Sequence, residues 1–567
     1  MASADDAITG EIVRNALVVA TEEASIVVVR ASHSSFIQEG ADACAALLDT
    51  DANLVALSTA TSLMHAASLR CALPALLEDV ALDAMRPGDV YALNDPYRGG
   101  IHANDILVFR PIFANSSAGD SARDQVVYFA GTLIHVADVG GVAAGGLAAL
   151  ATDTFVEGLL LPPVLLARDG QPDTDVLRII ARNSRTPDKV VGDVQALVAG
   201  VHAIARRVDD LHARFGVTDV DRVVRQDRVD SERRMRESFA ALPAGRYESS
   251  FRIDTDGIDD RTYDVHVAVT LPGDGTIDID LAGTSTQARG AINASVSQTL
   301  SGVVFACRCF ADLDIPMNEG CFTPLTVHLP RGTLVNPEPP AACGGRLVTV
   351  AAVTEAVLAA LAQAAPEHAV AASSLIQVFA LSGVRDDGAA WLTLLYEFGG
   401  LGARAGADGA DATGAFFLGG RSVIPQVEPV EAQYPFVVRS ARLLPDSGGP
   451  GEWRGGLGVE TVIELLADAQ LTVRGDRMGA LPPPGARGGE PGRPGSFSIE
   501  RADGTVERLP ARATGVSLAA GDRFVMRTSG GGGLGRVDDR DPDAIRTDVA
   551  TGRVTVTGAG DDYGKAP

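Results

Sequence analysis

The chain has 567 residues, too many for a single hydrophobic core, and its length predicts roughly three or four domain-sized units. Hydrophobic residues make up 46% and charged residues 21%, as is typical of a soluble globular protein. The net charge of −25 opposes binding to nucleic acid or to an anionic membrane, because both would repel an acidic surface.

The sequence indicates a cytoplasmic location. Acidic residues come early and no basic segment precedes an apolar run, so we expect no signal peptide. No uninterrupted apolar run reaches about 18 residues, so we expect no membrane span. The six cysteines are scattered, which fits reduced thiols and argues against a structural zinc site built from cysteine pairs.

The first half of the chain mixes helical and strand patterns. Apolar residues that recur every three to five positions predict helices, and short apolar runs bounded by turn residues predict strands. The expected elements are a helix at 7–31, a hairpin at 44–57, a helix at 67–79, strands at 106–113 and 126–134, two helices within 174–215 and a charged helix at 219–241. The polar segment 114–123 is expected to be an exposed loop.

From residue 245 the pattern becomes richer in strands, with alternating apolar and polar residues. Strands are expected at 247–253, 264–269, 277–281 and within 374–400, an amphipathic helix at 347–363, and a loop in the Pro/Gly-dense segment 474–497. We therefore predict a multidomain α+β protein. Its expected parts are an N-terminal mixed α/β domain with a metal site (1–243), a β-rich domain (244–345), a mixed α/β segment (346–445) and a Gly/Pro-rich β domain (446–567).

The most informative stretch is 92–141, which contains two histidines, each followed three residues later by an aspartate. His102 and Asp105 stand where one expected strand begins, and His135 and Asp138 stand where the next one ends. Imidazole nitrogen and carboxylate oxygen suit zinc, manganese or iron, and two histidines with one carboxylate leave coordination positions open for water or substrate. The alternative is that the histidines are hydrogen-bonded loop residues and the aspartates form turns.

The residues of this stretch resemble a known family. NDPYRGGIHANDILVFRPIF (94–113) and IHVADVGG (134–141) are similar to motifs of the hydantoinase B/oxoprolinase family, and the resemblance extends over nearly the whole chain. It implies metal ligation by His102, Asp105 and His135, with Asp42 from an N-terminal acidic motif at 39–49 as a further ligand. In this chain Ala43 stands where the family has an aromatic residue.

Three further residues are candidate catalytic groups. The resemblance implies a histidine near His65 that faces the site, although His65 could equally be an ordinary residue at the start of a helix. Glu157 could act as a general base beside a metal-bound water, or it could pair with an arginine. Asp138, in the second motif, is the third candidate.

The resemblance implies one subunit of an ATP-dependent hydrolase that opens cyclic amides such as hydantoins, 5-oxoproline or lactams. The nucleotide site would lie on a hydantoinase A-type partner in a hetero-oligomer. TSGGGGLGR (528–536) does not supply one here, because it lacks the Lys-Ser/Thr of a phosphate-binding loop. The alternatives are a subunit of an acetone- or acetophenone-type carboxylase, or a non-catalytic protein that binds a ligand or partner.

Overall fold

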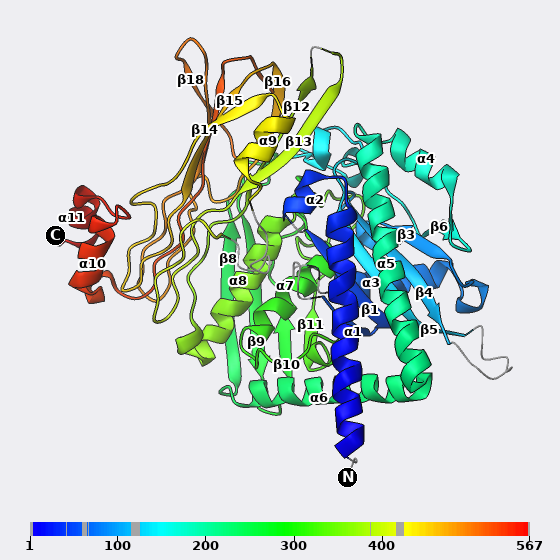
Figure 1. Ribbon diagram of the computed structural model, residues 1–567. Helices are drawn as coiled ribbons and strands as arrows, with labels where there is room; N and C mark the ends of the chain where they lie inside the picture. Colours follow the sequence, from blue (N-terminus) through cyan, green and yellow to red (C-terminus); the bar gives the residue numbers. More distant parts are fainter. Residues whose placement is uncertain are drawn as a thin grey trace.

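The computed structural model describes residues 4–40, 42–58, 65, 67–114, 125–385, 387–414 and 424–564. Within these ranges the chain folds into four β-sheets with helices packed against them, so the predicted multidomain α+β class is confirmed (Figure 1). The loop expected at 114–123 lies outside the described residues except for Ala114.

The first sheet carries the two histidine motifs. Its strand order is β2-β1-β5-β4-β3-β6-β7, and all neighbouring strands are antiparallel. The strands are β1 Ala43–Asp49, β2 Leu54–Leu57, β3 Val90–Leu93, β4 Asp105–Phe113, β5 Val126–His135, β6 Val164–Arg168 and β7 Gln171–Pro172.

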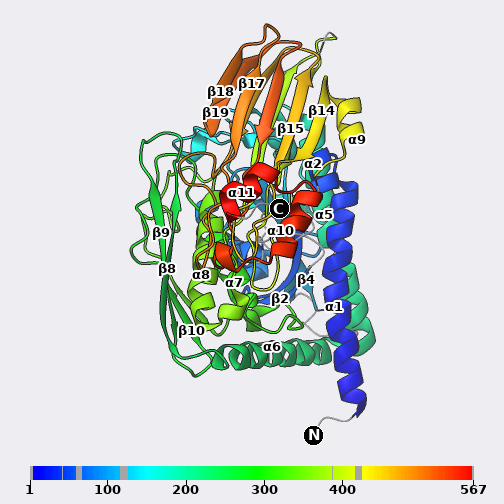
Figure 2. The same ribbon diagram turned by 90° about the vertical axis from the view of Figure 1, so that its left-hand side faces the viewer.

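Helices cover both faces of this sheet, which explains why its central strands are almost continuously apolar. The antiparallel pair α1 (Ala4–Ala31) and α5 (Pro187–Phe215) packs on one face, and α3 (Ser68–Asp79) packs on the other. The shorter α2 (Ser35–Gly40) and α4 (Thr174–Arg182) and the long α6 (Val217–Ala240) complete this part of the chain (Figure 1 for α4, Figure 2 for α2 and α6).

The second sheet has the order β11-β10-β9-β8, with one face exposed along β8. Its strands are β8 Gly245–Ile253, β9 Tyr263–Leu271, β10 Ile277–Asp280 and β11 Leu325–His328. Its other face packs against α8 (Leu347–Ala364), which in turn contacts α7 (Val296–Arg308).

The prediction of an amphipathic helix at 347–363 is correct for the helix and wrong for its amphipathic character. Helix α8 lies between the second sheet and α7, so nearly its whole circumference is buried. Among the described helices it alone is long and apolar enough to cross a membrane, and 72% of its apolar window is buried inside the protein.

The third and fourth sheets have the orders β13-β12-β16-β19 and β14-β15-β20-β17-β18, and the short helix α9 (Val427–Gln433) packs beside β14. Their strands are β12 Gln377–Val384, β13 Ala390–Glu397, β14 Phe436–Leu443, β15 Val459–Leu465, β16 Ala469–Arg474, β17 Ser496–Glu500, β18 Val506–Leu509, β19 Arg512–Leu518 and β20 Arg523–Arg527. Phe379, Phe436, Phe497 and Phe524 share one core cluster between them. Both sheets combine strands from before and after residue 445, while the division of the chain into four domains stays a prediction.

Below these sheets, extended glycine-rich segments run side by side towards the C-terminal helices α10 (Pro542–Ala550) and α11 (Val556–Tyr563) (Figure 1). We call residues 399–403, 447–458, 484–492 and 529–535 the glycine stack. Its segments are joined by backbone hydrogen bonds, for example from Gly531 to Gly456 (2.9 Å) and from Gly456 to Leu401 (2.8 Å). Backbones approach this closely only because Cβ atoms are missing.

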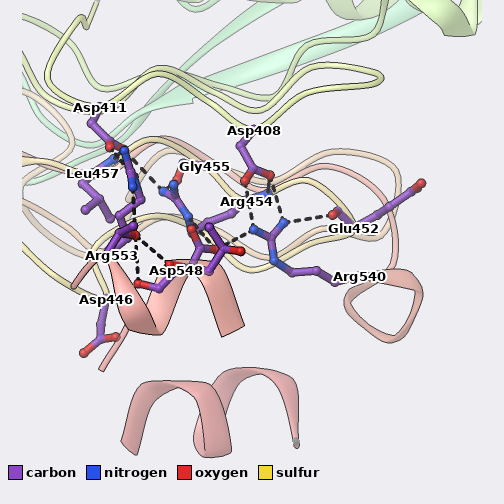
Figure 3. Close-up of polar contacts among 12 residues, drawn as sticks. Asp408, Asp411, Asp446, Glu452, Arg454, Gly455, Leu457, Arg540, Asp548 and Arg553 are labelled. Carbon is purple, nitrogen blue, oxygen red and sulfur yellow. Dashed lines mark hydrogen bonds and ion pairs between the residues drawn. The ribbon is translucent and has the colours of Figure 1, made fainter. Parts of the chain in front are cut away.

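Buried ion pairs attach the C-terminal helices to the glycine stack. The Arg540 guanidinium donates two hydrogen bonds of 2.9 Å to the Asp408 carboxylate and one of 2.6 Å to Asp548 on α10 (Figure 3). Asp548 also accepts from Arg454, which lies within the stack. These charges satisfy one another, so removing a single partner would leave a buried charge uncompensated.

Candidate metal centre

The end of the β4–β5 pair places the two histidine motifs together. In the antiparallel register Asp105, the first residue of β4, stands opposite His135, the last residue of β5. His102 lies in the turn that enters β4, where its carbonyl accepts the amide of Asp105 (3.0 Å). The prediction that two strand ends meet here is therefore confirmed, with His102 and Asp105 buried and His135 partly buried.

The three side chains converge on one point. His102 Nε2 lies 3.1 Å from Asp105 Oδ2, His135 Nδ1 lies 3.3 Å from Asp105 Oδ1, and the two ring nitrogens are 3.2 Å apart. Ligand atoms bonded to one tetrahedral zinc at about 2.05 Å would be about 3.3 Å apart. The donor set and its spacing therefore fit a small divalent ion.

Sequence reasoning missed Arg346, which donates from Nη2 to Asp105 Oδ2 at 3.0 Å and is itself buried. Burial opposes ionisation of Asp105, but the neighbouring His102 and the charge of Arg346 hold its pKa well below the usual range. Burial and the same arginine lower the pKa of His102 to about 3, so its ring stays neutral. An ionised carboxylate and neutral imidazoles are the forms that bind metal.

A cavity of about 70 Å³ opens beside the triad, between the first sheet and the third. Its first wall contains Asp42, His102 and His135, and the loop glycines Gly145 and Gly146. The facing wall consists of Ile376, Val378, Leu394 and Tyr396, on or beside β12 and β13, with Arg474 from the end of β16 and Arg346 and Leu347 from the start of α8. No local pattern in the sequence indicates that β12, β13 and β16 line the same cavity as the two histidines, which lie more than 200 positions earlier.

Asp42 lies in the cavity wall and is held by His65. His65 is fully buried, and its Nε2 lies 3.0 Å from Asp42 Oδ1. Asp42 as a fourth ligand stays a prediction. This contact lets His65 orient the Asp42 carboxylate, and the catalytic role considered for His65 stays a prediction.

Asp138 and Glu157 lie outside the cavity lining. Asp138 is buried, accepts the amides of Gly145 and Arg185 and pairs with the Arg185 guanidinium at 2.9 Å. It therefore holds the glycine turn that lines the cavity, and the catalytic role expected from sequence stays a prediction.

Glu157 is also buried and accepts the amides of Gly344 (2.6 Å) and Cys343 (3.1 Å). These bonds fix the segment that leads to Arg346. Burial raises the pKa of Glu157 to about 7, although the two amides act in the opposite direction. Of the two roles considered for it, pairing with an arginine is not seen among the described residues, and the role of general base stays a prediction.

The chain is similar in sequence and in fold to several known proteins. The chain is 28% identical over 575 residues to a putative D-/L-hydantoinase B-type subunit of Pseudomonas sp. strain NS671, covering 99% of this chain and 95% of that protein. The crystal structure of the ATP-dependent caprolactamase from Pseudomonas jessenii superposes with a TM-score of 0.88 at 27% identity, covering 98% and 96% of the two chains. A nucleotide-free acetone carboxylase has the same fold, with a TM-score of 0.89, 20% identity, and 98% and 79% covered.

The family model described as Hydantoinase B/oxoprolinase matches residues 6–537, nearly the entire chain. With the metal-type triad at the strand ends and the fold shared along the whole length, the chain belongs to the hydantoinase B/oxoprolinase family.

Proposed function

We propose that this chain is the metal-bearing subunit of a cytoplasmic, ATP-dependent hydrolase that opens a cyclic amide such as a hydantoin, 5-oxoproline or a lactam. Its partner in a hetero-oligomer would be a hydantoinase A-type subunit that binds ATP. The observation that carries the proposal is the convergence of His102, Asp105 and His135 within 3.3 Å of one another beside a cavity.

The residues of this chain would hold the ion and orient the ring. His102, His135 and Asp105 offer nitrogen and oxygen donors, with Asp42 in the same cavity wall as a further candidate. A divalent zinc, manganese or iron ion held there would polarise a carbonyl and make a water nucleophilic near neutral pH. The apolar side chains of Val378, Leu394 and Ile376 exclude bulk water and give a hydrocarbon ring a surface to rest on.

The division of labour with a partner is supported by the glycine-rich segment 528–536. Instead of forming a loop around an open phosphate site, its glycines donate and accept backbone bonds within the glycine stack. One related protein is named as a hydantoinase subunit and a solved relative as an ATP-dependent enzyme, which supports an ATP site on a separate partner. Transfer of phosphate to the amide oxygen would make the ring carbon a stronger electrophile.

The test combines metal analysis with ring opening. The chain is purified with its A-type partner, its metal content is measured, and ATP-dependent opening of hydantoin, 5-oxoproline and lactam rings is followed. His102→Ala should lose both the metal and ring opening. The matched control His328→Ala removes an exposed histidine that bonds Asp278 on the second sheet and should keep both.

Full activity in a metal-free His102→Ala complex would refute the proposed role of the triad. ATP turnover that depends on bicarbonate instead of on a cyclic amide would assign the chain to the carboxylases, whose fold it shares. A wild-type chain without bound metal and without turnover would support a non-catalytic binding role.

A further inference from the structure

The cavity beside the triad contains two buried arginines that metal binding does not require. Arg346 and Arg474 are 4% and 8% exposed, and both line the cavity. They come from different parts of the fold, Arg346 from the start of α8 and Arg474 from the last position of β16. A buried guanidinium is costly unless a negative partner compensates it, so the partners of each arginine are informative.

Arg346 has a partial set of partners. It donates from Nη2 to Asp105 and from Nε to Gln298 (3.3 Å), and the contacts among the described residues assign no acceptor to Nη1. Because Asp105 also contacts the two neutral imidazoles and would hold the proposed ion, its single charge is divided between Arg346 and that ion.

Arg474 has no ion pair with any residue that the structure describes. Its Nη1 donates to the carbonyl of Gly344, a neutral acceptor. The carboxylates that favour its charge, Asp476 and Glu157, are already bonded, Asp476 to Arg512 and Glu157 to the amides of residues 343 and 344. Arg474 therefore presents a buried positive charge to the cavity without a dedicated counter-ion.

The charge of the cavity lining points to an anionic ligand. With a divalent ion in place, the carboxylates of Asp42 and Asp105 balance the ion, and the two guanidinium groups remain as surplus positive charge. The 18-residue helix α8 also begins here, with Leu347 of its first turn in the wall, so the positive end of its dipole adds to the same field.

We propose that Arg474, Arg346 and the first turn of α8 bind the phosphoryl group that activates the substrate on its amide oxygen, and so hold the reacting carbon beside the metal centre. Guanidinium groups suit this ligand because their planar donors match phosphate oxygens. The assignment rests on the proposed function only for the identity of the ligand, since the buried positive site itself is independent of it.

The test begins with the purified full-length chain and orthophosphate as the probe. Binding is measured by titration calorimetry for the wild type, Arg474→Met, Arg474→Lys and the control Arg331→Met, which removes an exposed arginine paired with Glu338. Loss of a charge-assisted pair should weaken phosphate binding at least about tenfold in Arg474→Met. Arg474→Lys keeps the charge and should lose less, and Arg331→Met should bind as the wild type does.

The second arm measures ring opening in the complex with the A-type partner. Arg474→Met should reduce kcat/KM for an uncharged lactam and for 5-oxoproline by similar factors, because both would carry the same phosphoryl group. A loss confined to 5-oxoproline would assign the site to the substrate carboxylate and overturn the proposal. The proposal would also be overturned if Arg474→Met bound phosphate as the wild type does and a metal chelator abolished that binding. The metal ion alone would then bind the phosphate.

The two proposals fail in different ways. If no cyclic amide is opened but phosphate binding still depends on Arg474, the anion site stands and the function does not. If rings are opened at the wild-type rate by a folded Arg474→Met complex, the function stands and the anion site does not. The melting temperature of each variant shows whether it folds. Arg474→Lys, which keeps the positive charge, serves as the second control.

Discussion

Replacing Gly531 by alanine tests the claim that the glycine stack is packed backbone against backbone. A Cβ atom at this position would lie 2.1 Å from the Leu401 carbonyl oxygen, 2.4 Å from its carbonyl carbon and 2.7 Å from the Gly402 amide nitrogen. All three are backbone atoms, so no side chain can rotate away. The two segments would have to separate by roughly 1 Å in a region packed as densely as a crystal.

The expected cost follows from what that separation breaks. Gly531 donates its amide to Gly456 (2.9 Å) and accepts the amide of Gly449 (2.8 Å). Two strained or lost hydrogen bonds at about 1 kcal/mol each, with about 1 to 3 kcal/mol for overpacking, give a loss of about 3 to 5 kcal/mol in the free energy of unfolding.

Urea unfolding monitored by circular dichroism and tryptophan fluorescence would measure this loss, and Trp453, which bonds Leu534 within the stack, reports on the region directly. Gly10→Ala in α1 and Gly560→Ala in α11 are matched controls, because a Cβ at either helical glycine meets nothing within 4 Å. Both should be neutral or slightly stabilising, by up to about 1 kcal/mol. A Gly531→Ala chain that unfolds at the wild-type midpoint would refute the packing argument.

Three other predictions concern the site. Burial raises the pKa of Glu157 to about 7 from 4.5, so the folded state binds this proton more tightly than the unfolded state. As the pH rises from 4.5 to about 7, the free energy of unfolding of the wild type should therefore fall by on the order of 3 kcal/mol relative to that of Glu157→Gln, as measured by urea unfolding. The same pH dependence in both proteins would contradict this prediction. Asp138→Ala should cost about 3 kcal/mol of stability through the lost bonds to Arg185 and the glycine turn. Full stability with abolished turnover would instead favour the catalytic role expected from sequence. Val378→Phe narrows the cavity and should raise KM for bulky rings more than for small ones in steady-state assays, and equal effects on both would place the substrate elsewhere.

The metal-type triad could be predicted from sequence because two local signals agreed. Nine histidines in the chain made a repeated His-x-x-Asp spacing noticeable, and strand patterns placed both motifs at strand ends. An antiparallel pair then brings Asp105 opposite His135 without any long-range information. The facing wall of the cavity could not be predicted, because no pattern in the sequence pairs Arg474 with residues more than 300 positions earlier.

Two helices show where local patterns fail. Helix α7 (Val296–Arg308) was not predicted because its small, β-branched and polar residues favour helix weakly, although Val296, Leu300 and Val304 recur at helical spacing. It is stabilised by packing against α3 and α8. Helix α8 was found, but the few polar residues in it suggested an exposed face. Thr354 and Glu355 are in fact buried, and Glu355 accepts hydrogen bonds from Ser373 and Arg477.

The Pro/Gly-dense segment 474–497 was expected to be a loop, and between β16 and β17 it forms neither helix nor strand. The composition of the segments of the glycine stack alone does not indicate that they bond to one another in register. Glycine weakens isolated helices and strands, yet here it permits backbones of several segments to pack where an added Cβ would collide with a neighbouring backbone. The stack can be recognised only once the segments are seen together.

Two separate sheets line the cavity beside the triad. The first sheet contributes the histidines and carboxylates, and the third contributes most of the apolar surface and the guanidinium of Arg474. Under the proposed function, the reacting groups and the surface that selects the ring come from separate regions of the chain. Exchanging the segment around β12 and β13 between relatives, with Arg474 on β16 retained, should retune which ring is accepted while the reaction itself is preserved, a practical route to new lactam-opening enzymes.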